Sequence, residues 1–151
     1  MDRPANINPR IIEALYNEGL VLSDEVRAMF SLADHGSRGP EDEARIALSC
    51  EALRTTTRMM HAVAWLLNHR AYFNGELSEF QLRRYGRLTD FPDSDPEKLA
   101  LLPAQTCELI RATERFHARL KRLDNGWRER EAAAPSAIAK LRERLGLAAR
   151  S

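Results

Sequence analysis

Residues 40–74 read PEDEARIALSCEALRTTTRMMHAVAWLLNHRAYFN, and this stretch decides the fold. It carries three rows of apolar or small residues at helical spacing. One row recurs every seven residues, the second follows it four residues later, and the third lies beside the first: Ile46, Leu53, Met60 and Leu67; Cys50, Thr57, Ala64 and Ala71; Ala52, Met59, Leu66 and Phe73. Because residues at i, i+4 and i+7 share one helix face, the rows merge into a wide apolar band that other helices must cover.

The ends of this stretch carry helix start and stop signals. Pro40 is followed by three acidic residues, which interact favourably with the positive end of a helix dipole. His69 and Arg70 lie near the other end, before the stop signal Asn74-Gly75. The charge pattern and the apolar pattern therefore predict one uninterrupted helix.

The rest of the chain also has helical periodicity and no strand signal. We expect long helices over residues 9–35 and from 103 to about 124, the latter either stopping at Asn125-Gly126 or continuing to 131. A short helix is expected from about 77 to 86, then a loop to a new start at Pro96 capped by Ser94 or Asp95. The prediction is an all-α, antiparallel three-helix bundle with a short extra helix: an arm at 1–8, the bundle at 9–131 and a loosely attached C-terminal segment at 132–151.

The apolar band on residues 40–74 is too wide for two partner helices. We therefore expect a second copy of the chain to cover the remainder in a symmetric homodimer. Gly19, within an apolar row of the first helix, is either a tolerated surface glycine or a point of close approach to another backbone.

Composition narrows the class of protein. The chain has 151 residues, 23 Lys plus Arg and 22 Asp plus Glu, giving a net charge of +1. This balance disfavours a protein built to hold nucleic acid or an anionic membrane. No apolar run approaches the ~20 residues of a membrane span, and no signal peptide is evident. Cys50 and Cys107 fit free, reduced thiols, so we expect a cytoplasmic protein.

Motifs for chemistry are missing from the sequence. The four histidines, His35, His61, His69 and His117, do not stand at metal-site spacing, and no nucleophile or phosphate-loop motif occurs. We therefore predict no catalytic residue, metal, cofactor or small-molecule substrate. A ligand site inside the bundle is an alternative for which only the polar run at residues 55–57 gives a hint.

Two surfaces have residues suited to partners. Arg58, Trp65 and Tyr72 recur every seven residues, and these residue types are enriched at interaction hot spots; the alternative is that Trp65 is a core residue. A basic patch of Arg83, Arg84 and Arg87 beside Tyr85 would allow a DNA-binding regulator as the alternative function. The balanced net charge favours a solvated face for that patch.

A family resemblance adds a function. The run CEALRTTTRMM at residues 50–60, followed by AWLL at 64–67, resembles the RcdA family, regulators of CtrA degradation in alphaproteobacteria. The resemblance covers about a third of the chain. It implies a non-enzymatic homodimeric adaptor that tethers cell-cycle regulators to the ClpXP protease, with response-regulator-type cargo or adaptors as further partners. The residues expected at the dimer seam or a partner surface are Glu51, Arg54, Thr56, Thr57, Arg58, Trp65 and Tyr72.

Overall fold

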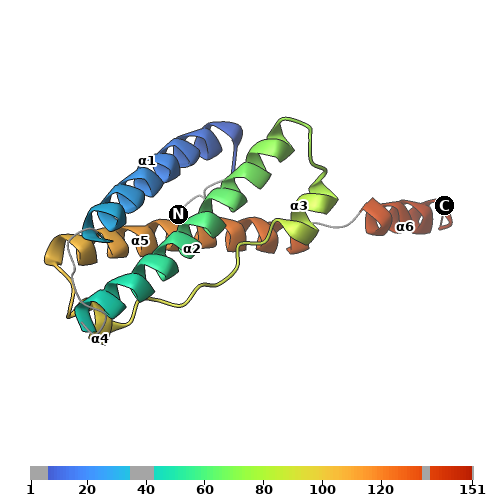
Figure 1. The fold of residues 1–151 in the computed structure, drawn as a ribbon. Coiled ribbons are helices and arrows are strands. Elements are labelled where there is room, and N and C mark those ends of the chain that lie inside the picture. The colour runs from blue at the N-terminus through green and yellow to red at the C-terminus, as the bar shows by residue number, and fades with distance from the viewer. Residues whose placement is uncertain (1–6, 35–42, 134–136, 151) are drawn as a thin grey trace, which may run out of the picture.

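The computed structural model describes residues 7–34, 43–133 and 137–150, and every regular element in these ranges is a helix (Figure 1). The helices are α1 (Pro9–Asp34), α2 (Glu43–Phe73), α3 (Glu79–Tyr85), α4 (Pro96–Leu99), α5 (Ala104–Ala133) and α6 (Ala137–Ala148). The expected all-α class is confirmed. The predicted loop at 36–39 and the predicted start at Pro40 lie outside the described residues.

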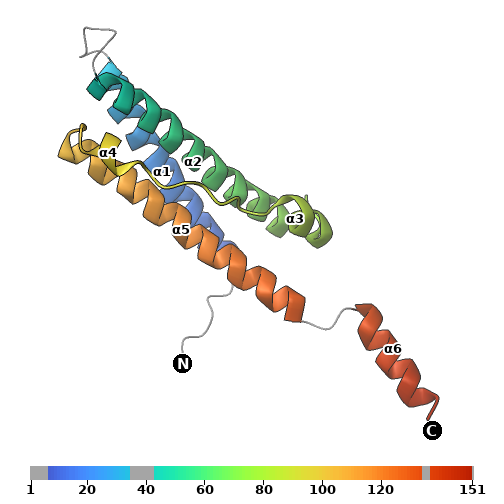
Figure 2. The same ribbon diagram turned by 90° about the horizontal axis from the view of Figure 1, so that it is seen from below.

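Three long helices, α1, α2 and α5, pack around one core (Figures 1 and 2). Its buried apolar residues come from all three helices and from Leu88: Ile12, Leu15, Val26, Met59, Ala62, Trp65, Leu66, Leu88, Phe116 and Leu120. Gly19 is buried in α1, where a Cβ would lie 3.2 Å from the ring of Phe116. The close approach suggested for this glycine exists, but its neighbour is an aromatic ring and not another backbone.

The third long helix runs in the opposite direction to the one predicted. Arg58 bonds to Thr113 and Trp65 bonds to Asp124, so residue numbers rise together along α2 and α5, which are parallel. The prediction of an antiparallel up-down-up bundle is wrong at this helix. The reason is the extended crossing segment, residues 86–95, which returns along the bundle before α5 begins (Figure 2). At about 3.3 Å per residue it spans about 33 Å, most of the length of a long helix.

Local signals set the ends of the shorter elements as predicted. Gly75 has φ +79°, and the Glu76 N–H donates to Ala71 O at 2.9 Å, which closes the last turn of α2. Ser78 and Gln81 form a reciprocal capping box at the start of α3. Asp95 caps α4 through a hydrogen bond from the Glu97 N–H.

The apolar rows of α2 divide between the core and the surface. Met59 and Leu66, from the third row, are buried. The row with seven-residue spacing faces outward: Ile46, Leu53, Met60 and Leu67 are 54%, 72%, 66% and 44% exposed. The helices of a single chain therefore leave the most regular row of this band uncovered, and the prediction that a second copy covers the remainder stays a prediction.

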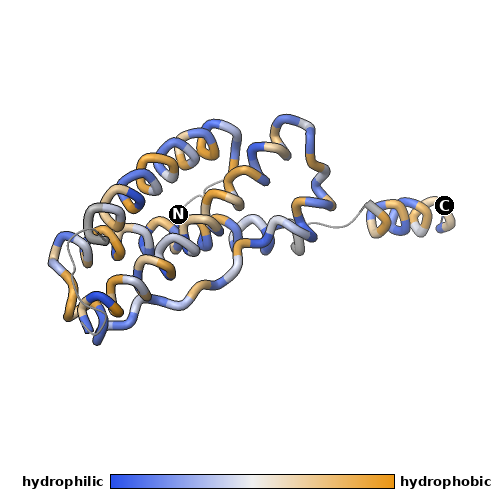
Figure 3. The backbone as a smooth tube through the Cα atoms, in the orientation of Figure 1, coloured by the Kyte–Doolittle hydropathy of each residue, from blue (hydrophilic) through white to orange (hydrophobic). Residues whose placement is uncertain are grey.

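The C-terminal part of the chain is helical to its last described turn. α5 continues past Asn125-Gly126 to Ala133, which decides between the two predicted ends in favour of the longer helix. α6 stands apart from the bundle in both views (Figures 1 and 2), and its side chains from Ile138 onward are exposed. Hydrophobic and hydrophilic residues alternate along it, as they do along α1 (Figure 3).

Candidate functional site

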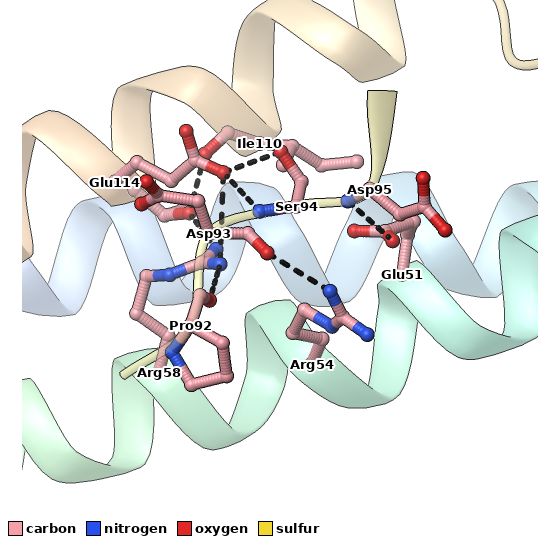
Figure 4. Close-up of polar contacts among 10 residues, drawn as sticks. Glu51, Arg54, Arg58, Pro92, Asp93, Ser94, Asp95, Ile110 and Glu114 are labelled. Atoms are coloured by element: carbon pink, nitrogen blue, oxygen red, sulfur yellow. Dashed lines mark hydrogen bonds and ion pairs between the residues drawn. The ribbon is translucent and has the colours of Figure 1, made fainter. Parts of the chain in front are cut away.

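The predicted site residues of α2 hold the crossing segment against the bundle. Glu51, Arg54 and Arg58 lie on successive turns and point towards residues 92–95 (Figure 4). Glu51 Oε1 accepts from the Asp95 N–H at 3.3 Å, and Arg54 Nη1 donates to Asp93 O at 2.9 Å. These contacts satisfy backbone groups of a segment that has no secondary structure of its own.

Arg58 is the centre of this polar cluster and is only 1% exposed. Its Nη1 donates to Thr113 Oγ1 at 3.0 Å, and its Nη2 donates to Pro92 O at 3.3 Å. Glu114 lies 3.6 Å from Nη2 and also accepts from the backbone and hydroxyl of Ser94. Burial lowers the pKa of Arg58, while the Glu114 carboxylate opposes this shift. Arg58 thus joins α2, α5 and the crossing segment.

A second polar centre forms around Asp124, which is fully buried in α5. Its Oδ1 accepts from Trp65 Nε1 at 3.1 Å, and its Oδ2 accepts from the Leu88 N–H at 3.2 Å. Arg128 Nε lies 3.2 Å from both carboxylate oxygens, and its Nη1 donates to Arg83 O. Trp65 is therefore a core residue, so the hypothesis that the row of Arg58 and Trp65 is an exposed partner surface is wrong.

The remaining predicted site residues lie in different places. Thr56 is exposed on the side of α2 that faces α1, and Thr57 donates back to Leu53 O at 2.8 Å. Thr55 is buried, and Tyr72 is half-buried with its ring 5.1 Å from that of Phe73. The run at residues 55–57 therefore points in several directions and does not gather into one ligand site.

The arginine patch proposed for DNA is divided. Arg83 lies 3.5 Å from Glu79, and the Arg84 guanidinium lies over the ring of Tyr85. α3, which carries both, has seven residues and packs against α2. Arg87 is exposed on the crossing segment. Nothing in this arrangement favours a recognition helix.

His69 is a buried, neutral histidine between two indole rings. Its ring centroid lies 4.1 Å from that of Trp65 and 5.8 Å from that of Trp127. Burial lowers the pKa of His69 to about 4, with Asp124 opposing and Arg128 reinforcing the shift. Burial also lowers the pKa of His117.

These histidines predict acid sensitivity. Between pH 6.5 and 4, His69 is protonated in the unfolded chain but stays neutral in the folded chain. The free energy of unfolding is therefore highest above pH 6.5 and decreases as the pH falls towards 4. At about 1.4 kcal/mol per pKa unit, the loss approaches about 3 kcal/mol at pH 4. Urea unfolding at several pH values measures it, with His69→Phe as the control that removes the proton site. Equal pH slopes for the two proteins would contradict this account.

The described residues hold no cluster of metal-binding side chains and no membrane-spanning helix. No group of three or more His, Cys, Asp or Glu in the described ranges is placed to hold a metal ion. No helix in the part of the chain that the structure describes is long and apolar enough to cross a membrane. Cys50 and Cys107 are both free.

An apolar groove lies between α1 and α2, with a volume of about 940 Å³. The outward row of α2 supplies Leu53, Met60 and Leu67, and α1 supplies Leu20 and Phe30. Small side chains lie between the large ones: Ser49, Ala52, Thr56, Val63 and Ala64. Arg27, the one charged residue in the described lining, pairs with Asp24 at 2.8 Å. We call this surface the α1–α2 groove.

Comparison with known proteins identifies the family. A family model described as "Protein of unknown function (DUF1465)" matches residues 4–149. The chain belongs to the DUF1465 family. No curated protein and no solved structure matches it.

Membership of the DUF1465 family corrects the resemblance to the RcdA family, which is wrong. The structure explains why the motif misled. Glu51, Arg54, Arg58 and Trp65 in that run bind the crossing segment and α5, so their spacing describes internal packing and not an adaptor surface. The ClpXP and response-regulator partners were implied by the resemblance alone.

Sequence reasoning missed half of each polar centre. Glu114 and Asp124 were not predicted as site residues, and Ser94 was predicted only as a possible helix cap, although the three complete the contacts of Arg58 and Trp65. The one available signal was Asp124 itself, which follows Leu120 and Leu123 and precedes Trp127 on the apolar side of α5. A carboxylate in that position is buried at a cost unless it is paired.

Proposed function

We propose that this member of the DUF1465 family is a non-enzymatic, homodimeric cytoplasmic adaptor that acts through protein–protein contacts. The observation that carries the proposal is the α1–α2 groove with its outward row on α2. Large exposed apolar patches on a folded domain mark interaction sites. The buried polar side chains of α2 hold the crossing segment and α5, so the polar clusters have a structural explanation without catalysis.

A second copy of the chain fits the outward row best. Ile46, Leu53, Met60 and Leu67 repeat with the seven-residue period of a two-helix seam. When two copies of α2 pack antiparallel about a two-fold axis near Thr56, Ile46 faces the partner's Leu67 and Leu53 faces the partner's Met60. A small residue at the axis allows the two backbones to approach closely. The row is therefore self-complementary, as an isologous interface requires.

The mass of the protein in solution tests the dimer. We expect light scattering to give twice the chain mass of 17.2 kDa for the parent protein. Replacing Leu53→Glu and Met60→Glu buries four carboxylates at the seam, and we expect this to weaken the dimer by about a hundredfold or more. Both residues are exposed in the single chain, so the variant should still fold.

Phe80→Glu is the matched control, since Phe80 is 69% exposed on α3, away from the groove. A monomeric parent, or a double variant that stays dimeric, would contradict the seam. A monomeric parent would leave the groove open to a helix of another protein.

Partner capture tests the adaptor role. The parent and the Leu53→Glu, Met60→Glu variant are each used as bait in lysate of the source cells. Specific partners should be recovered with the parent in repeated experiments; repeated recovery of none would contradict an adaptor. The same capture tests the ClpXP and response-regulator partners.

A further inference from the structure

A second groove lies on another face of the bundle, between α1 and the C-terminal half of α5. Its volume is about 450 Å³. Its floor is apolar, with Ile11 and Leu15 from α1 and Leu123 from α5. Gly126 opens it further, because a Cβ at this position would meet no heavy atom within 4 Å. We call this surface the α1–α5 groove.

Among the described residues, the charged side chains that line the α1–α5 groove are those of Arg119, Arg122 and Arg130. Arg119 pairs with Glu18 at 2.7 Å, whereas Arg122 has no ion-pair partner among the described residues. The basic edge continues along α5 through Arg115 and Arg111, which are exposed and likewise without a described partner. Positions 111, 115, 119 and 122 share one helix face, so the arginines form a continuous stripe that borders the apolar floor at Arg119 and Arg122.

We propose that the α1–α5 groove binds an acidic, amphipathic helical segment of a partner protein. Apolar side chains of such a segment would enter the floor between Ile11, Leu15 and Leu123, in the manner of a helix in a groove. Its carboxylates would pair with the guanidinium groups of the stripe, where planar two-point contacts are available. This partner surface goes beyond the proposed dimer, because it lies on a different pair of helices and stays open when two α2 helices pack together.

The chain's own α6 is a poorer occupant of the α1–α5 groove than an acidic segment, because α6 is basic. α6 is amphipathic, with Ile138, Leu141 and Leu145 on one side, and it is free of the bundle in the structure. It also carries Lys140, Arg142 and Arg144 against the single acid Glu143. Like charges would face the arginine stripe, so an acidic segment of another protein fits better.

Nucleic acid is a poorer fit than an acidic peptide. The stripe borders an apolar floor that offers nothing to a phosphate backbone. Further along α1, Glu18 and Glu25 lie across from Arg115 and Arg119 and would repel phosphates. A peptide can place a basic or neutral residue there, whereas a duplex carries a regular array of negative charge.

Fluorescence anisotropy tests the proposal with a defined probe. The probe is a labelled peptide of about 18 residues, long enough for about five helical turns, with leucines at i, i+4 and i+7 and glutamates on both flanks. We expect the parent protein to bind it at low salt and to bind the glutamine version at least about tenfold more weakly. Replacing Arg115→Glu and Arg122→Glu should weaken binding of the acidic peptide by a similar factor.

Two further variants test whether net charge alone explains the binding and whether the apolar floor takes part in it. Arg142→Glu with Arg144→Glu makes the same change in net charge on α6 and should leave binding unchanged. Gly126→Phe fills the groove at a position where a side chain meets open space, and it should abolish binding while the helical circular dichroism stays unchanged.

Three outcomes would overturn the proposal: no binding of the acidic peptide, equal binding by the stripe variant, or equal loss in the α6 variant. Tighter binding of a duplex DNA than of the peptide, through the same arginines, would show that the ligand of this groove is nucleic acid. The mass of each protein is measured in the same samples, so a failed dimer and a failed peptide site are distinguished.

Discussion

Replacing Arg58→Ala should lower the free energy of unfolding by about 3–5 kcal/mol, a large share of the stability of a single domain. The substitution removes the buried guanidinium that bonds Thr113 and the Pro92 carbonyl, and it leaves Glu114 without its cation. It also opens a cavity at a side chain that is 1% exposed. Chemical unfolding followed by circular dichroism measures the loss.

Arg54→Ala is the matched control, one turn away on the same helix. Arg54 is half-buried and makes one hydrogen bond to the Asp93 carbonyl, so its loss should cost about 1 kcal/mol. Similar effects of the two substitutions would show that Arg58 is not the centre of the polar cluster. A stable, folded Arg58→Ala protein would restore the hypothesis that this residue serves a partner.

The helix ends could be predicted from sequence because their causes are local. Gly75 stops α2 by adopting positive φ, and Ser78 caps α3 with a residue three positions away. The same holds for Asp95 before Pro96. Each signal involves residues a few positions apart, so no knowledge of the tertiary fold is needed.

The face of α2 that enters the core could not be predicted in the same way. Hydrophobicity favours the row of Leu53 and Met60, yet this row is exposed while Arg58 and Trp65 are buried. Polar side chains become suitable for a core only when distant partners exist. Thr113 lies 55 positions from Arg58 in the sequence, and Asp124 lies 59 positions from Trp65. No local pattern contains such pairs.

The predicted direction of α5 was wrong for a related reason. A short connection forces neighbouring helices to be antiparallel, but about 30 residues separate α2 from α5 and allow either direction. The crossing segment favours the parallel orientation of α5, because α2 and α5 supply hydrogen-bonding groups along the length of the segment. Lys121 donates to Leu88 O, and Glu114 accepts from Ser94 at the other end.

Asp124→Ala should destabilise the protein about as strongly as Arg58→Ala, by about 3–5 kcal/mol. The carboxylate is fully buried and accepts from Trp65 and from the backbone of Leu88, so its loss leaves both donors unsatisfied. It also leaves Arg128 without its anion. Unfolding measurements give the magnitude, and the emission of Trp65, measured in a Trp127→Phe background that removes the second tryptophan, reports the lost indole hydrogen bond.

Asp90→Ala separates this effect from the loss of an aspartate in general. Asp90 pairs with Lys121 at 3.3 Å but is 91% exposed, so solvent screens the pair and its loss should change stability by less than about 0.5 kcal/mol. Asp124→Asn should lower the free energy of unfolding by an amount between those of Asp124→Ala and Asp90→Ala. The amide oxygen still accepts one hydrogen bond, while the charge facing Arg128 is gone. If Asp124→Asn were as stable as the parent, hydrogen bonding alone would hold the crossing segment at Leu88. If it were as damaging as alanine, the ion pair with Arg128 would be the contact that fixes this end of the segment.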